Sequence, residues 1–484
     1  KGTLMNDNKN YKPQFKKDYH KSPQSQGSVQ DTIEIGQRIP LTIKRLGING
    51  EGIGYFKHTI CFVKGALPDE VVTATVTAIH PRYMTAELHA IREKSEDRVE
   101  PRDTYAGKVG GFELEHLAYP AQLEFKRDIV RQALEKYRPA GHQYYKLLPT
   151  IGMDNPYEYR NKAQFQVRKL DGKVAAGLYK EGSHDLVDLP TCSVQHPLTM
   201  KIMRRVVALL DELDVPIYDE EHGSGIVKTI VVRVAATTNE AQLVFITNST
   251  KLPHKREMIA ELQKDFPEIV SYMQNVNKGK TSLVWGDDTA CLAGKTFIQD
   301  KLDGLTFNLS ARAFYQLNSS QTSKLYAEAR KALELSPTDN LVDAYSGVGT
   351  IGLSLADQVK EVRGMDIIPE SVEDANENAK LNGITNATYE VGRAEDLVSQ
   401  WMAAGFHPDA IIVDPPRTGL DDKLLETIIH AKPERFVYIS CNPSTLARDL
   451  TQLTTDYIID YIQSIDMFPQ TARCEAVVKF TRRS

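Results

Sequence analysis

The stretch Leu341-Val-Asp-Ala-Tyr-Ser-Gly-Val-Gly-Thr350 decides the fold, because it combines a short buried strand, a glycine-rich turn and the start of a helix. Glycines such as Gly347 and Gly349 let the backbone of a turn approach a ligand closely. Asp366 ends the next predicted strand, where an acidic side chain can accept both hydroxyls of a ribose. The turn lacks the third glycine of the dinucleotide fingerprint, which favours a smaller adenosyl ligand over NAD. A tight turn without any ligand is the alternative.

Around this stretch, strands and helices alternate from residue 340 onward, which predicts an α/β fold with a doubly wound parallel sheet. A closing hairpin is expected near residues 457–467 and 476–481. The strands of the sheet are predicted at residues 341–344, 361–366, 388–391, 410–414 and 436–440.

Two polar motifs follow strands of this sheet, at the carboxyl edge where such sheets bind ligands. Asp414-Pro-Pro-Arg417 follows the fourth strand, and Cys441 follows the fifth, between Ser440 and Asn442. Cysteine is most often a small buried hydrophobic residue. Beside polar residues at a ligand-binding edge, however, a thiol is accessible and open to activation. The position therefore favours a nucleophilic cysteine.

The composition is that of a globular protein, with 484 residues, 41% of them hydrophobic and 25% charged. A net charge of −5 gives no general attraction to nucleic acid, so any RNA-binding surface has to be local. No apolar run reaches the roughly 18 residues of a membrane span, so no membrane partner is predicted. Five scattered cysteines do not form a disulfide framework, and we expect a cytoplasmic protein. A monomer is the default expectation.

Residues 1–30 form a basic tail that we expect to be disordered, because it contains too few apolar side chains to build a core. Residues 1–4, ahead of Met5, resemble a cloning remnant and are left out of the fold. Residues 31–91 contain short alternating strands divided by glycine-rich turns, a pattern typical of a small OB-like β-barrel.

Residues 92–300 mix helices and strands and are predicted to form a separate central α+β domain. A helix is expected at residues 120–137. The stretch Tyr157-Glu-Tyr-Arg-Asn-Lys162 interleaves aromatic and cationic side chains, as single-stranded RNA binders often do. Cys61 and Cys291 lie in apolar strand contexts and are expected in the core. The histidines have no metal-ligand spacing with cysteines or carboxylates, so no metal site is predicted.

In combination, these motifs resemble the RNA (uracil-C5)-methyltransferase family with a TRAM domain. Residues 31–91 are similar to its TRAM barrel, 92–300 to its central RNA-binding domain, and 301–484 to its Rossmann-like class I methyltransferase domain. The matching motifs, besides the glycine-rich turn, are Phe314-Tyr-Gln316-x-Asn318, Asp414-Pro-Pro-Arg417-x-Gly, Tyr438-Ile-Ser-Cys-Asn-Pro-x-Thr445 and Asp466-Met-Phe-Pro-Gln-Thr-x-x-x-Glu475.

The resemblance implies a covalent methylation of uridine that uses S-adenosylmethionine. Cys441 is the implied nucleophile toward C6 of uracil, and Glu475 the base that removes the C5 proton. The target uridine has to leave its base stack to react. The implied cofactor-binding residues are Gln316, Tyr345, Gly347, Asp366 and Asp414, and the implied contacts to substrate RNA are Phe314 and Arg417.

Two departures from the family pattern affect this prediction. Members with an iron–sulfur cluster carry cysteines where this sequence has Asp103, Val109 and Phe112, and only the fourth position, Cys192, is retained. One thiolate cannot hold a four-iron cluster, so no cluster is predicted. Arg473 stands where the family usually has histidine, and an arginine cannot relay a proton.

The cluster-free pattern resembles the branch of the family that acts on 23S ribosomal RNA. Three alternatives stay open. A tRNA T-loop uridine methyltransferase is the nearest, although such enzymes generally lack the barrel. An amino-group methyltransferase is opposed by Arg417, where those enzymes have an aromatic residue, and by Cys441. A catalytically silent RNA-binding module is opposed by the intact set of candidate site residues.

Overall fold

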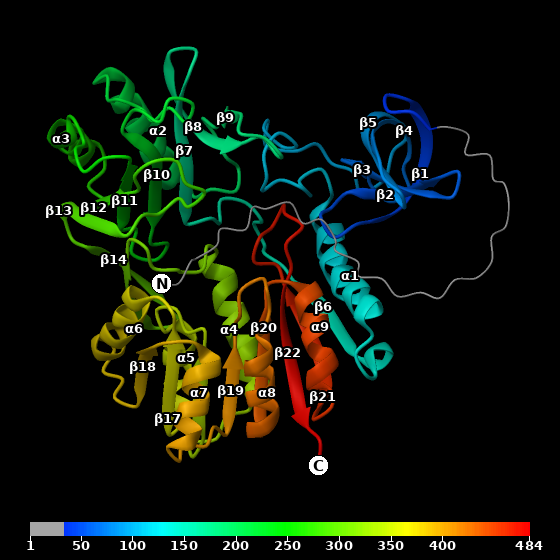
Figure 1. The fold of residues 1–484 in the computed structure, drawn as a ribbon, viewed down its shortest axis with the longest axis vertical. Coiled ribbons are helices and arrows are strands. Elements are labelled where there is room, and N and C mark those ends of the chain that lie inside the picture. Colours follow the sequence, from blue (N-terminus) through cyan, green and yellow to red (C-terminus); the bar gives the residue numbers. More distant parts are fainter. Residues whose placement is uncertain (1–32) are drawn as a thin grey trace.

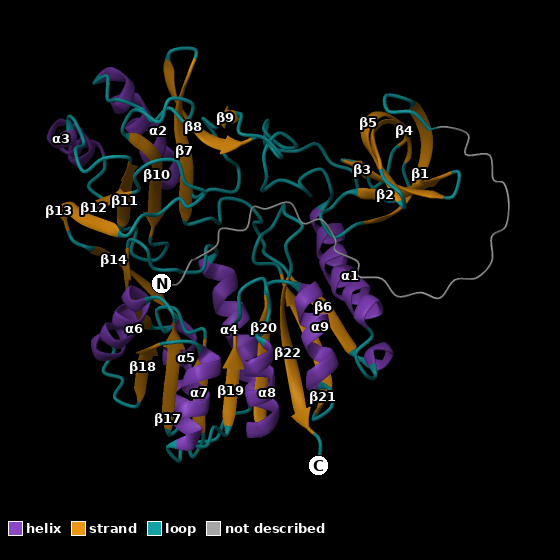
Figure 2. Cartoon of the chain, viewed as in Figure 1, coloured by secondary structure: helices purple, strands orange, loops and turns teal. Residues whose placement is uncertain are grey.

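The computed structural model describes residues 33–484, which form a β-barrel and two larger bodies, each built on a β-sheet (Figure 1). The tail predicted for residues 1–30 lies outside the described residues. Within residues 33–484, no helix has the length and apolar character needed to cross a membrane. Figure 2 shows the barrel set to one side, while the two sheets carry nearly all the helices.

The barrel closes in the strand order β1-β2-β3-β5-β4, as predicted for an OB-like fold. Its strand pairs are antiparallel except for β3 and β5, which run parallel. Ile39, Leu41 and Ile43 alternate along β1 and are buried inside the barrel, which also contains Cys61. The strands are β1 (Arg38–Leu46), β2 (Gly52–Phe56), β3 (Thr59–Lys64), β4 (Val71–Ile79) and β5 (Tyr83–Glu93).

The central body is a seven-stranded sheet in the order β13-β12-β11-β10-β7-β8-β9. Helices α2 (Pro197–Glu212) and α3 (Lys255–Asp265) bury their apolar residues with it. The expectation that Cys291 is a core residue is wrong: it lies on the edge strand β13 and is exposed. The strands are β7 (Lys162–Leu170), β8 (Lys173–Tyr179), β9 (Leu186–Asp188), β10 (Val227–Val234), β11 (Ala241–Thr247), β12 (Ile269–Val276) and β13 (Asp288–Gly294).

The C-terminal body is an eight-stranded sheet in the order β18-β17-β16-β19-β20-β22-β21-β6, which confirms the predicted doubly wound α/β fold. Strands β16 to β20 are parallel to one another, whereas β22 is antiparallel to both of its neighbours. The strands are β16 (Asn340–Ala344), β17 (Glu361–Asp366), β18 (Ala387–Val391), β19 (Ala410–Val413), β20 (Arg435–Ser440), β21 (Tyr457–Ile465) and β22 (Glu475–Arg482); β14 (Phe297–Leu302) and β15 (Leu305–Ser310) form a separate hairpin before them.

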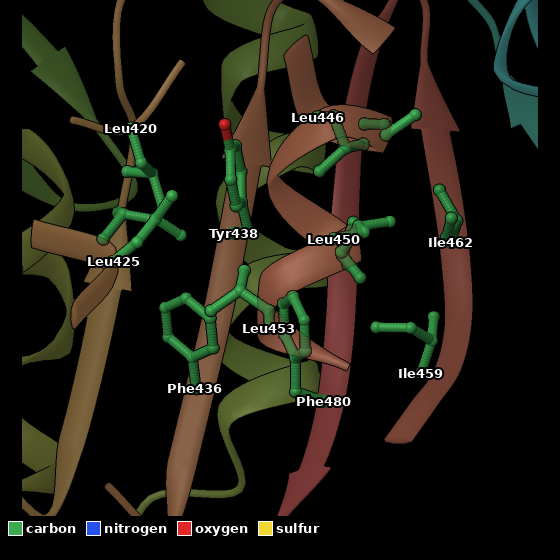
Figure 3. Packing of buried hydrophobic residues seen from close by; sticks show 14 of the residues in the cluster. Leu420, Leu425, Phe436, Tyr438, Leu446, Leu450, Leu453, Ile459, Ile462 and Phe480 are labelled. Atoms are coloured by element: carbon green, nitrogen blue, oxygen red, sulfur yellow. The ribbon is translucent and has the colours of Figure 1, made fainter. Parts of the chain in front are cut away.

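Helices cover both faces of this sheet, because successive residues of each strand point to opposite sides. In β20, Phe436 and Tyr438 face α7, α8 and α9, whereas Val437 and Ile439 face α4, α5 and α6. Figure 3 shows the first of these cores, where leucines of α9 cover the rings of Phe436 and Phe480. The helices are α4 (Ser319–Leu333), α5 (Thr350–Leu355), α6 (Pro369–Leu381), α7 (Ala394–Ala403), α8 (Asp422–Ala431) and α9 (Pro443–Leu453), with short 3-10 turns at His142–Tyr144 and Ala356–Gln358.

Helix α1 and strand β6 lie between the barrel and the central sheet in the sequence but pack with the C-terminal body, whereas the contiguous division at residues 92 and 300 placed them in the central domain. Helix α1 (Tyr119–Tyr137), at the predicted position, buries Phe125 and Ile129 in the same core as α9. Strand β6 (Lys146–Ile151) pairs in parallel with β21 and ends the sheet. Pro149 suits an edge strand, because proline has no amide hydrogen for a second partner. Local periodicity predicts the helix but not the sheet that it covers.

Candidate active site

The pairing of β20 with β22 brings Cys441 and Glu475 together. Ser440 is paired with Ala476 in this antiparallel ladder, so the next two residues outward, Cys441 and Glu475, lie opposite each other where the ladder ends. Asp414 follows the neighbouring parallel strand β19 at the same edge. Three polar groups from distant parts of the sequence therefore converge at the carboxyl edge of the parallel strands.

The glycine-rich turn lies farther along this edge, between β16 and α5. Tyr345 begins it with φ of 63°, a left-handed conformation that is uncommon for a tyrosine and frequent at functional sites. Gly347 has φ of 54°, and its amide donates to a carboxylate oxygen of Asp366 over 3.0 Å. A β-carbon built on Gly347 meets no heavy atom within 4 Å, so open space lies above the turn. Both features suit a turn that a ligand approaches.

A cavity of about 660 Å³ opens beside the turn. Tyr345 and Asp366 line it, together with the apolar Ile367 and Leu420 and with Gly392, which follows β18. The lining also contains charged side chains, namely Arg393, Glu395, Asp421, Asp422 and Arg448. An acidic side chain that lies beside aromatic and apolar ones, close to a glycine-rich turn, fits the adenosine part of an S-adenosyl ligand. Gly347, Asp414, Gln316 and Cys441 are outside the lining of this cavity, so the structure separates an adenosine side from a thiol side.

Cys441 is partly buried between the loops that follow β19 and β20. Its Sγ lies 3.8 Å from the carbonyl oxygen of Pro415. The two loops are held together by Asn442, whose side-chain amide donates to the carbonyl of Arg417 over 2.9 Å. Burial, followed by the charges of Glu475 and Asp414, raises the pKa of the Cys441 thiol to about 12, while Arg417 acts in the opposite direction. The thiol is therefore protonated at neutral pH.

Glu475 is buried, whereas Arg417 and Arg473, whose charges act on it, are exposed. Burial and the charge of Asp414 raise the pKa of Glu475 well above the usual range, and the two arginines lower it. Burial also raises the pKa of Asp414. Arg473, which replaces the family's usual histidine, is exposed, and its guanidinium lies 5.5 Å from the ring centre of Phe468.

The remaining predicted residues, Phe314 and Gln316, lie on the loop between β15 and α4. The loop is fixed by Asn161, which donates to the carbonyl of Gln316 over 2.9 Å. Asn318, at the start of α4, donates to the carbonyl of Met467 over 3.1 Å, which ties this loop to the segment before Glu475. Phe314 is 58% exposed, which is unusual for a large apolar side chain and leaves its ring free to contact a base.

Sequence reasoning did not single out Asp343. It is buried beneath the glycine-rich turn and accepts the amide hydrogen of Gly352 over 2.9 Å, and burial raises the pKa of its carboxyl to about 7. Its position in the strand before the turn was visible in the sequence, but its burial was not. Ile367 and Gly392 were also missed, although each directly follows a parallel strand and so belongs to the ligand-binding edge.

The residues at the cluster positions of the family do not fit an iron–sulfur cluster. Val109 and Phe112 are buried in the apolar core of the central body, and Cys192 packs against it. Asp103 accepts backbone amide hydrogens from Tyr105 and Ser193, each over 2.8 Å. Among residues 33–484, no group of three His, Cys, Asp or Glu side chains is arranged to hold a metal ion. The absence of a cluster stays a prediction from the donor set.

The fold and the site define a class, the S-adenosylmethionine-dependent methyltransferases. Within it, the sequence pattern of the tRNA (uracil-5-)-methyltransferase family matches residues 118–483, and that of the TRAM domain matches residues 33–89. The chain therefore belongs to this family of RNA uracil-5 methyltransferases, and its N-terminal barrel is a TRAM domain.

Similar curated proteins carry only the name uncharacterized RNA methyltransferase. One from Lactiplantibacillus plantarum is 70% identical over 455 residues, which are 94% of this chain and 95% of the relative. One from Enterococcus faecalis is 56% identical over 455 residues, which are 94% of this chain and 100% of the relative. These relatives agree with the family in assigning RNA methylation and name no RNA target.

A similar solved structure is the tRNA (uracil-54, C5)-methyltransferase of Pyrococcus abyssi in complex with S-adenosyl-L-homocysteine. It is 26% identical with a TM-score of 0.73, and the match covers 92% of this chain and 100% of that chain. A match over so much of the chain extends into the barrel. The barrel therefore does not by itself exclude a tRNA enzyme.

The acidic neighbours of Cys441 predict how its reactivity depends on charge. Asp414→Asn removes a negative charge and lowers the pKa of the thiol, so more thiolate is present at about pH 8. We expect iodoacetamide to alkylate Cys441 roughly threefold faster or more than in the wild type. Mass spectrometry of the digested protein measures the rate, with the exposed Cys291 as the internal reference. Unchanged or slower alkylation of Cys441 would contradict the assigned environment.

The buried carboxyl of Glu475 also predicts a pH-dependent cost to stability. Because its pKa is raised in the folded state, the folded protein binds this proton more tightly than the unfolded chain, and stability falls as the pH rises above the ordinary carboxyl range. Glu475→Gln should therefore stabilise the protein by about 1 kcal/mol at about pH 8 and by less at about pH 5.

Thermal unfolding at the two pH values measures this difference. Glu426→Gln is the matched control, because Glu426 is an exposed glutamate on α8. If the Glu475→Gln variant is no more stable than the wild type at the higher pH, burial of the ionised carboxylate does not destabilise the folded protein, and the prediction is wrong.

Proposed function

We propose that the protein methylates C5 of specific uridines in 23S ribosomal RNA, with Cys441 as nucleophile and Glu475 as proton-abstracting base. The observation that carries this proposal is the strand register that sets these two residues opposite each other beside Asp414. Uracil C5 is a weak nucleophile, so the ring has to be activated before it can accept a methyl group. The thiol of Cys441 supplies that activation by adding to the ring, and the carboxylate of Glu475 reverses it by removing the C5 proton.

Activation begins when the Cys441 thiolate adds to C6 of the uracil. The Sγ–C6 bond forms, and the electron pair of the C5=C6 bond moves onto the ring as an enolate. C5 then attacks the methyl carbon of the sulfonium, whose carbon–sulfur bond breaks and releases S-adenosylhomocysteine. Arg417, whose charge lowers the pKa of the thiol, favours the thiolate needed for the first step.

Glu475 completes the reaction by removing the proton from the methylated C5. The electron pair of the C5–H bond restores the C5=C6 bond, and the Sγ–C6 bond breaks to return the thiolate. Burial raises the pKa of Glu475, which makes its ionised form a stronger base than an exposed carboxylate. Arg417 and Arg473 lower this pKa and so help to keep the carboxylate ionised when it is needed.

The methyl donor is assigned to the edge between the glycine-rich turn and Cys441. In this proposal Asp366 accepts the ribose hydroxyls and Tyr345 borders the adenosine. Gly347 lies beside the ligand at the edge of this cavity, where its amide holds the carboxylate of Asp366. Gln316 and Asp414 hold the methionine part, nearer the thiol. Such a placement directs the methyl group toward the uracil ring that Cys441 has engaged.

The choice of 23S ribosomal RNA is supported by the cluster-free sequence pattern at Asp103, Val109 and Phe112. In this proposal a uridine in a structured loop is flipped out of its stack. Its neighbouring base lies on the exposed ring of Phe314, and Arg417 contacts the RNA. The protein acts as a monomer in the cytoplasm.

A second candidate target is the T-loop uridine of tRNA. The similarity to the Pyrococcus abyssi tRNA (uracil-54, C5)-methyltransferase over 92% of this chain favours it. Both targets use the same chemistry, so the distinction rests on the RNA alone.

Methylation of purified RNA tests both the chemistry and the target. The protein is incubated with labelled S-adenosylmethionine and, separately, with unmodified 23S ribosomal RNA and tRNA transcripts. We expect 5-methyluridine in the ribosomal RNA only, and its loss by at least about a thousandfold in Cys441→Ala. Label in tRNA alone would overturn the target and leave the mechanism intact. Methylation by Cys441→Ala at the wild-type rate would overturn the nucleophile.

A further inference from the structure

The segment that leads into Glu475 has no regular secondary structure, yet it is held at nearly every residue. It consists of residues 466–474, between β21 and β22. Helix α1, which comes from a region more than 300 residues earlier in the chain, contacts it near its start, in its middle and at its end. We call residues 466–474 the base segment, and three contacts join it to α1.

The first contact is a buried ion pair between Lys126 of α1 and Asp466. Neither side chain has any exposed surface. The ammonium of Lys126 also donates to the carbonyl of Phe468 over 3.0 Å, and Tyr119 donates its hydroxyl to the other oxygen of Asp466 over 2.9 Å. A buried charge pair requires such additional hydrogen bonds to offset its desolvation. The start of the base segment is therefore fixed to α1.

The second contact is a reciprocal pair between Gln122 of α1 and Gln470. The side-chain amide of Gln122 donates to the side-chain oxygen of Gln470 over 2.8 Å, and the backbone amide of Gln470 donates back to the oxygen of Gln122 over 3.0 Å. Gln470 has φ of 72°, in the left-handed region that a side chain rarely adopts. Such a conformation persists only where its surroundings impose it. Gln122 contributes to that constraint, together with the backbone amide of Leu114, which donates to the carbonyl of Gln470 over 2.9 Å, and the carbonyl of Pro156, which accepts from the Gln470 side chain over 3.2 Å.

The third contact lies next to Glu475 itself. The Cys474 thiol donates to the carbonyl of Lys126 over 3.4 Å, and Cys474 is only 4% exposed. The base segment therefore leaves α1 one residue before the proposed base. Glu475 then lies near Asp414, and two carboxylates in one buried site repel each other. A segment free to move would let Glu475 turn toward solvent.

We propose that α1 is a positioning element for proton abstraction, in which Gln122 and Lys126 act through the base segment to hold Glu475 against the methylated uracil. This inference rests on the proposed function. It assigns α1 to the second half of the reaction, in which the C5 proton passes to Glu475, the C5=C6 bond reforms and the Cys441 thiolate is expelled. Methyl transfer precedes that step and does not require Glu475.

The proposal predicts a specific kinetic defect in Gln122→Ala. Methyl transfer should stay within about threefold of the wild type, while release of the methylated RNA from Cys441 slows about tenfold or more, so a protein–RNA adduct that resists detergent accumulates. Rapid quenching with unmodified 23S ribosomal RNA and tRNA transcripts, followed by denaturing electrophoresis, measures both steps. Gln132→Ala is the matched control, because Gln132 lies on the same helix but contacts Arg45 and Leu46 of the barrel.

Gln470→Gly provides a second variant, because glycine accepts the left-handed backbone without strain while the side-chain bonds to Gln122 and to the carbonyl of Pro156 are lost. It should show the same slow release. Wild-type release in both variants would overturn the proposal, as would an equal loss of methyl transfer and release. If the wild type methylates RNA and Cys441→Ser does so equally well, the covalent mechanism fails, and the positioning role fails with it.

Discussion

The antiparallel strand β22 is the constraint on which the candidate active site depends. In a sheet made only of parallel strands, the carboxyl ends of the strands form the binding edge, so every loop at that edge follows a strand. By reversing direction, β22 places its first residue, Glu475, at that edge, opposite Cys441 at the end of β20. The register then sets the relation between the two residues without any long loop. A slip of one residue would turn Glu475 to the other face of the sheet.

The site that this register creates gathers ionisable groups whose charged forms burial disfavours. Burial raises the pKa of Cys441, Asp414 and Glu475, and the charge of Asp414 raises the pKa of Cys441 and of Glu475 further. The surrounding structure has to hold them in place, and it does so with two well-packed cores on the faces of the sheet and with the anchored segment that precedes Glu475. The buried ionisable groups therefore lower the stability of the fold at this site. Their shifted pKa values suit proton transfer and thiolate chemistry, as is common at functional sites.

Local patterns predicted much of the fold and the site. The glycine-rich turn, the alternating strands and the residues that follow them identified the doubly wound sheet and located Asp366, Asp414 and Cys441 at one edge, because parallel strands share that edge. The path of α1 and β6 into the C-terminal body was not predictable, since periodicity gives an element's buried face but not its partner. For the same reason Cys291 was misplaced, because an apolar strand gives no sign that it will lie at a sheet edge.

The central claim, that Cys441 and Glu475 act on opposite sides of one uracil, is tested most directly with an RNA transcript in which 5-fluorouridine replaces uridine. A base cannot remove fluorine from C5 as it removes a proton, so the elimination step is blocked. The reaction should therefore stop after methyl transfer, with the ring still bonded to the protein. Mass spectrometry of the digested complex should find methylated 5-fluorouridine attached to Cys441. An adduct on another cysteine, or none from a protein that methylates the matching uridine transcript, would contradict the account.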